Sequence, residues 1–197
     1  DSAGEIVVSE VATRGGTLVS SLRSEPRTFN RILDQAFPVD LFNILTSSKL
    51  IRVNRATRAL EPGLVEKWAT SPDNLTFTLT LRDGVTWSDG TPFTSADVLF
   101  TFQAIYDPKV SSVIASGLRV NGQPLKVTAP DASTVVVTLP GTFGPGIAIL
   151  DNVAVLPKHK LQAALASGRF AQALGPATPP ADLVSLGPFM LKTYEAG

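Results

Sequence analysis

The chain has 197 residues, no cysteine, and 17 basic side chains against 17 acidic ones. This charge balance argues against nucleic-acid binding, which usually needs a basic face. The lack of cysteine excludes disulfides, thiol catalysis and thiolate metal sites. A hydrophobic content of 44% with 17% charged residues is typical of a globular protein with a core, and no apolar run approaches the length of a membrane span.

The first residues carry weak structural signals. Residues 1–14 have no strong periodicity and lack the basic start and apolar core of a signal peptide, so we expect a flexible leader. Residues 17–22 form a predicted strand. Residues 23–37 are polar and irregular, which predicts a surface loop.

A helix and a hairpin are expected next. Pro38 is a favoured first-turn residue, and Leu41, Phe42 and Leu45 give the helix a packing face. Residues 51–60 predict a short hairpin around a basic turn. We expect its basic side chains to be solvated, because a phosphate site would need glycines and a helix N-terminus, which this turn lacks.

The central stretch carries the clearest pattern. Apolar side chains alternate with threonines over residues 75–82, as in a half-buried strand. Asp83-Gly84 predicts a hairpin turn into a short strand over residues 85–88, and Asp89-Gly90 predicts a second turn. Thr94 and Asp97 then form a capping box for a helix that ends before Asp107-Pro108.

The C-terminal half alternates strands, turns and helices. Asn121-Gly122 predicts a hairpin turn, and the residues around 147–156 are compatible with either helix or strand. The other predicted elements are a strand over residues 133–139, a loop over 140–146, a helix opened by Pro157, and a closing strand over 186–194.

Residues 81–98 read Leu-Arg-Asp-Gly-Val-x-Trp-Ser-Asp-Gly-x-Pro-Phe-Thr-x-x-Asp-Val. This segment resembles the signature region of the peptide/nickel-type extracellular solute-binding proteins of ABC importers (family 5, dipeptide/oligopeptide-binding-like). Three flanking pieces agree with the resemblance. They are residues 16–19, similar to the family's first strand; residues 60–68, similar to the approach to the signature; and residues 187–191, similar to its "gly-pro-phe-x-leu" return strand.

The resemblance implies a mixed α/β (α+β) fold of the periplasmic-binding-protein-like type II class. Family members are longer, so we expect an N-terminal lobe fragment with a mixed sheet, β-hairpins and flanking helices. The implied division places residues 15–40 and 182–197 in a partial first-lobe domain, and residues 41–181 in a smaller inserted domain. The second lobe of the same protein would then be missing.

The resemblance also implies a function. The intact protein would capture peptides, or similar solutes such as a nickel complex or an oligosaccharide, and deliver them to the permease subunits in the membrane. It would act at the periplasmic or extracellular face of the cytoplasmic membrane, after export, without a cofactor. The loop after the first strand faces the ligand cleft in the family, so the predicted ligand-binding residues are Glu25, Pro26, Arg27, Thr28, Phe29 and Asn30. Here Arg31 replaces the family's usual proline.

Two other functions stay open. A hydrolase could use a pair among Asp83, Asp89 and Asp97, although the Asp-Gly turns and the capping box explain these carboxylates more simply. A lone histidine, His159, cannot build a His-rich zinc site, so we expect no metal site and no catalytic residue. Alternatively, the chain is a stand-alone interaction domain that pairs through an edge strand, and uncovered apolar surface would favour self-association.

Two residue types have competing roles. Trp68 and Trp87 could stack on a ligand, but both adjoin elements with clear packing demands, so core or lobe-interface packing is favoured. Arg23 and Arg82 could bind a ligand carboxylate bidentately, but Arg82 ends the alternating strand on its polar face, where we expect a structural salt bridge.

Overall fold

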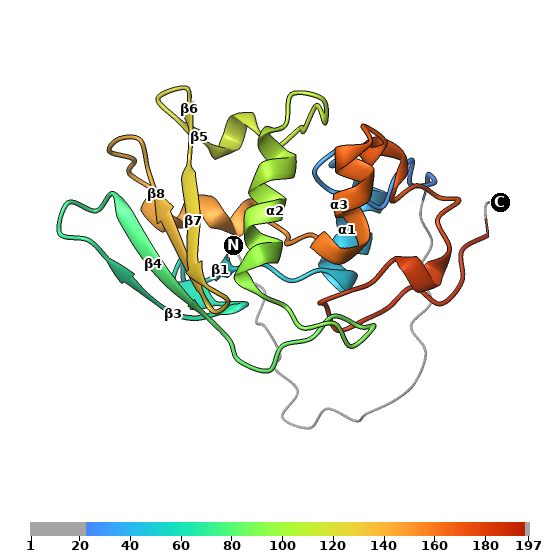
Figure 1. The fold of residues 1–197 in the computed structure, drawn as a ribbon, viewed down its shortest axis with the longest axis horizontal. Helices are drawn as coiled ribbons and strands as arrows, with labels where there is room; N and C mark the ends of the chain where they lie inside the picture. The colour runs from blue at the N-terminus through green and yellow to red at the C-terminus, as the bar shows by residue number, and fades with distance from the viewer. Residues whose placement is uncertain (1–22, 196–197) are drawn as a thin grey trace, which may run out of the picture.

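A computed structural model describes residues 23–195, and the structural statements below concern these residues. A four-stranded sheet forms one end of the molecule, helix α2 lies against it, and α3 and α1 lie beyond α2 (Figure 1). The helices are α1 (Phe37–Thr46), α2 (Ser95–Tyr106) and α3 (Lys158–Ala166), with 3-10 turns η1 (Ser116–Leu118), η2 (Gly146–Asn152), η3 (Phe170–Gln172) and η4 (Pro180–Asp182). The strands are β1 (Ile51–Val53), β2 (Leu60–Pro62), β3 (Val65–Thr70), β4 (Thr76–Leu81), β5 (Arg119–Val120), β6 (Gln123–Pro124), β7 (Lys126–Asp131) and β8 (Thr134–Thr138).

The main sheet has the order β3-β4-β8-β7, and two hairpins, β1-β2 and β5-β6, stand apart from it. Every pair among the described strands is antiparallel, so the expected mixed sheet is not found within residues 23–195. The reason is connectivity: short turns join β3 to β4 and β7 to β8, whereas parallel neighbours need a crossover. The predicted first strand (residues 17–22) and the leader lie outside the described residues.

Strand β4 follows the predicted alternation. Phe77, Leu79 and Leu81 are buried, and the threonines between them lie on the other face. Both edges of β4 are occupied, by β3 and β8.

The predicted hairpin between β4 and residues 85–88 is therefore wrong. With no free edge on β4, the chain turns away from the sheet at Gly84, whose φ is 68°. A single bridge between Thr86 and Pro92 then closes the second turn around Gly90, where φ is 83°. The turns are thus predicted correctly, but the short strand is not.

Helix α2 is the core helix, and its capping box forms as predicted. The Thr94 N–H donates to Asp97 Oδ2 at 3.0 Å, and the buried Asp97 also accepts the Lys158 N–H on Oδ1 at 3.0 Å. The Thr101 hydroxyl oxygen accepts the Leu156 N–H at 2.9 Å. Helix α2 therefore fixes the start of α3, which the sequence placed correctly at Pro157.

The hairpin turn at residues 121–122 and the strand over 133–139 are also found, and the ambiguous residues 147–156 are mostly 3-10 helix. The closing strand over residues 186–194 is wrong. Instead, the N–H groups of Leu186 and Gly187 donate to the Thr46 carbonyl, and that of Phe189 donates to the Leu45 carbonyl. The segment satisfies the free carbonyls at the end of α1 rather than pairing in a sheet.

Candidate functional site

Helix α1 lies between two hollows of different character. Pro38, Leu41, Phe42 and Leu45 face the first, which we call the apolar groove, of about 500 Å³. Asp40, Asn43, Ile44 and Ser47 face the second, the polar groove, of about 670 Å³. The two sets alternate at helical spacing, so the grooves flank opposite faces of α1.

The predicted ligand loop borders the apolar groove with only part of its length. Glu25, Pro26 and Phe29 line the groove, and Tyr194 lines it next to them. The Tyr194 hydroxyl donates to the Glu25 carboxylate, and this hydrogen bond raises the pKa of Tyr194. Phe29 is mostly buried and packs edge-on against the Tyr194 ring, with centroids 5.4 Å apart.

The remaining loop residues have other positions. Thr28 donates to the Leu174 carbonyl at 3.1 Å, and Asn30 Oδ1 accepts the Ile32 N–H at 3.2 Å. Both side chains are buried, so they shape the loop from inside, while Arg27 is exposed. The structure thus brings Glu25, Pro26 and Phe29 together at a groove and does not bring Thr28 and Asn30 there. Ligand binding by the loop stays a prediction.

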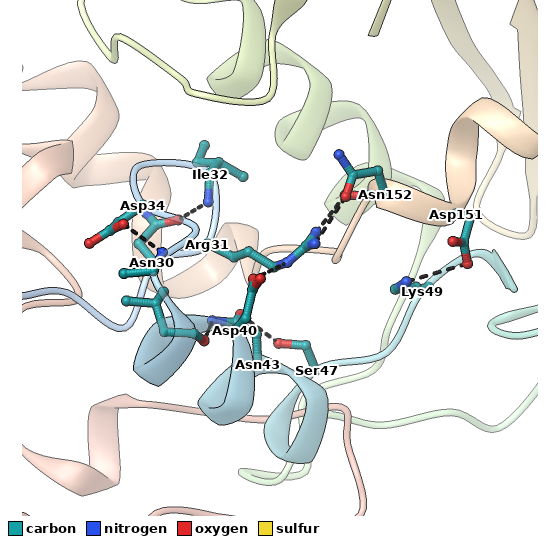
Figure 2. Close-up of polar contacts among 12 residues, drawn as sticks. Asn30, Arg31, Ile32, Asp34, Asp40, Asn43, Ser47, Lys49, Asp151 and Asn152 are labelled. Atoms are coloured by element: carbon teal, nitrogen blue, oxygen red, sulfur yellow. Dashed lines mark hydrogen bonds and ion pairs between the residues drawn. The ribbon is translucent and has the colours of Figure 1, made fainter. Parts of the chain in front are cut away.

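The polar groove contains charged residues that sequence reasoning missed (Figure 2). The Arg31 side chain donates through Nε to Asp40 at 2.9 Å, and through its two other nitrogens to the carbonyl and side-chain oxygens of Asn152. Lys49 Nζ lies 3.3 Å from Asp151 Oδ1, and Figure 2 shows this pair apart from the contacts of Arg31 with Asp40 and Asn152. The only sequence signal was Arg31 at the position of the family's proline.

The three aspartates of the hydrolase hypothesis each accept hydrogen bonds from backbone N–H groups. Asp83 Oδ1 accepts the Gly84 N–H, Asp89 Oδ1 accepts the Thr91 N–H, and Asp97 caps α2 and α3. Within residues 23–195, no group of three or more His, Cys, Asp or Glu side chains is placed to hold a metal ion. The same residues contain no helix long and apolar enough to span a bilayer.

Asp89 has a second partner that the sequence did not suggest. His159 Nε2 lies 2.9 Å from Asp89 Oδ2, and the imidazole packs on the Trp87 ring with centroids 5.9 Å apart. Partial burial of Asp89 opposes its ionisation, but the hydrogen bonds from His159 and Thr91 outweigh it and lower the pKa of Asp89. The pair ties the second Asp-Gly turn to the first turn of α3.

Both tryptophans pack in or against the core, and Arg82 bonds to backbone carbonyls. Trp87 is buried, and Trp68 packs partly buried against the core, as predicted. The predicted salt bridge of Arg82 is wrong: its Nε donates to the Gly63 carbonyl at 2.6 Å. The end of β4 lies beside this carbonyl, because Arg82 N–H also bonds the neighbouring Leu64 carbonyl at 2.8 Å.

The fold is that of a substrate-binding protein lobe, and known structures share it. It matches the ABC transporter substrate-binding protein CtaP of Listeria monocytogenes with a TM-score of 0.75 and 25% identity, over 89% of this chain and 34% of that one. NikZ of Campylobacter jejuni, solved with Ni(L-His), matches with a TM-score of 0.67 and 25% identity, over 87% of this chain and 32% of that one. The expected mixed α/β, periplasmic-binding-protein-like type II class is confirmed.

The sequence comparisons identify the family. Residues 59–197 match the model of "Bacterial extracellular solute-binding proteins, family 5 Middle", and the chain belongs to this family. A probable ABC transporter-binding protein of Deinococcus radiodurans is 29% identical over 93% of this chain and 31% of its own length. The periplasmic murein peptide-binding protein MppA of Escherichia coli is 30% identical over 96% of this chain and 36% of its own length. The chain therefore spans about a third of these relatives.

Proposed function

We propose that the chain is the first-lobe part of an extracytoplasmic substrate-binding component of an ABC importer. It would capture peptides or similar small solutes, such as a nickel complex or an oligosaccharide, and deliver them to membrane permease subunits. The observation that carries this proposal is the family match over residues 59–197, next to a loop that presents Glu25, Pro26 and Phe29 at a groove. Export to the periplasmic or extracellular side follows from the same proposal.

The mechanism would be enclosure of the ligand, with no bond broken. A lobe closing by a hinge buries most of a small ligand, and affinity depends on the complete enclosing surface. This chain spans about a third of its relatives, so it would supply one wall of the cleft. The proposed division, with residues 15–40 and 182–197 in the first lobe and 41–181 in the smaller domain, belongs to this proposal. Helix α1 crosses its boundary at residue 40.

Calorimetry on two lengths of protein tests the function. The longer gene product that contains these residues should bind a di- to octapeptide, a nickel–histidine complex or an oligosaccharide, whereas residues 1–197 alone should bind weakly or not at all. Within the longer protein, Glu25→Gln should weaken binding. Glu66→Gln, at an exposed position of β3, should leave it unchanged. The proposal is wrong if the longer protein binds none of these ligands.

Exposed apolar side chains on α1 and in the C-terminal segment that docks on it support a second expectation, self-association of the isolated chain. Phe37, Leu45, Phe189 and Met190 are exposed, and the Phe189 N–H bond to Leu45 joins the two segments. Contiguous apolar surface favours association in water. Size-exclusion chromatography over a concentration series should show a shift to larger species, and a constant monomer volume would contradict it.

A further inference from the structure

The polar groove holds more positive than negative charge. Four cationic side chains line it, from Arg31, Lys49, Arg52 and Arg55, against the carboxylates of Asp40 and Asp151. Arg31 pairs with Asp40 and Arg52 pairs with Glu61. Lys49 and Arg55 then share the single carboxylate of Asp151, so one positive charge is left without a counter-ion among the described residues.

Lys49 and Arg55 also keep unused hydrogen-bond donors. Lys49 Nζ carries three N–H bonds, and its contact within residues 23–195 is the one to Asp151 Oδ1 at 3.3 Å. That same oxygen accepts the Val53 N–H at 3.1 Å. The closest carboxylate oxygen to Arg55 is Asp151 Oδ2 at 3.7 Å, which exceeds hydrogen-bond distance. Both cations therefore have donors available to an added anion.

Apolar side chains line the same groove as these cations. Ile44 is 71% exposed and lines the groove together with Pro62 and Pro188. A large exposed aliphatic side chain in the same groove as cationic donors fits a ligand with an apolar body and a negatively charged end. Arg31 is held by three hydrogen-bonded contacts, so this side of the groove is already ordered before a ligand arrives.

We propose that the polar groove binds a carboxylate carried on an apolar body, with Lys49 and Arg55 binding the carboxylate and Ile44 contacting the apolar part. The groove faces the side of α1 opposite the ligand loop, so this site is separate from the cleft wall of the proposed function. A peptide C-terminus with an apolar last residue and a medium-chain fatty acid share this chemistry. The experiment below has an arm for each.

The test is an NMR titration of the isotope-labelled 197-residue chain. Changes in the amide chemical shifts are the readout, which detects even millimolar binding. The probes are the tripeptide alanyl-alanyl-leucine, its C-terminal amide, and octanoate. The free acid should shift amides around the groove, those of Lys49 and Val53 among them, in a saturable way. The amide should bind at least about tenfold more weakly or not at all, since it lacks the charge that Lys49 and Arg55 would bind. Saturable octanoate binding with the same shifts would show that a simple fatty acid suffices.

Variants separate the site from general charge effects. Arg55→Gln should weaken the free acid about tenfold and leave the fold intact, because this side chain is 87% exposed. Lys49→Gln should weaken it similarly. Arg58→Gln removes the same charge from the same hairpin outside the groove and should change nothing. Equal binding of acid and amide, an unaffected Arg55→Gln, or no saturable shift with either acid would overturn the proposal.

Discussion

The sheet packed against α2 and the region around α1 differ in how far their side chains and backbone groups are covered by other parts of the chain. In the first region, β4 has neighbours on both edges, its apolar face is buried, and the helix starts are capped by Asp97. In the second, α1 leaves Phe37 and Ile44 each 71% exposed and borders two open grooves. The first region is closed by its own contacts, whereas the second leaves apolar and polar side chains uncovered.

The largest expected contrast comes from two leucines, one in each region. Leu79 on β4 is fully buried, so Leu79→Ala should cost about 3 kcal/mol of unfolding free energy through lost burial and a cavity. Leu45 on α1 is 39% exposed, and Leu45→Ala should cost under about 1 kcal/mol. Urea denaturation of both variants measures the difference. Equal losses of unfolding free energy would mean that Leu45 is packed as tightly as Leu79.

Asp97 should give the next largest effect. Asp97→Ala removes the acceptor for the Thr94 and Lys158 N–H groups in a buried place. We expect a loss of about 2 to 3 kcal/mol, because two donors lose their partner at once. Asp83→Ala, in the exposed first turn, should cost under about 0.5 kcal/mol and serves as the control. A small loss at Asp97 would show that the cap is not what joins α2 to α3.

Gly187 tests how the C-terminal segment docks on α1. A Cβ at this position would lie 2.5 Å from the Thr46 carbonyl carbon and 2.6 Å from the Leu45 oxygen, both backbone atoms. We expect Gly187→Ala to cost about 1 to 2 kcal/mol, limited because the segment can detach instead of straining the core. Hydrogen exchange should speed up at the N–H groups of Gly187 and Phe189. Unchanged exchange there would contradict the docking.

Local signals were sufficient for much of the fold. The threonine alternation of β4, the Thr94–Asp97 box and the Asn121-Gly122 turn each act within a few residues, and each was predicted correctly. The strand predicted at residues 85–88 failed because both edges of β4 are taken by β3 and β8, and the strand predicted at 186–194 failed because its N–H groups bond the end of α1. Both outcomes depend on residues far along the sequence.

The site shows the same limit more strongly. The position of the ligand loop could be predicted, but not the direction of its side chains, since Thr28 turns inward to bond Leu174, far along the sequence. The Lys49–Asp151 pair joins residues 102 positions apart and leaves no local pattern. Sequence therefore located one groove in part and missed the other.

Asp89 is expected to give the smallest effect. Its carboxylate pairs with His159 at 2.9 Å, and both side chains are 27% exposed, so Asp89→Asn should cost about 0.5 kcal/mol at neutral pH. Because the pKa of Asp89 is lowered in the folded state, the pair stabilises the protein above the ordinary value of 3.8, and this contribution is lost as the pH falls below it. Urea denaturation of wild type and Asp89→Asn at several pH values should show the difference shrinking only in that acid range. A difference that is the same at every pH would contradict a lowered pKa of Asp89 in the folded state, and with it the stabilising hydrogen bonds from His159 and Thr91.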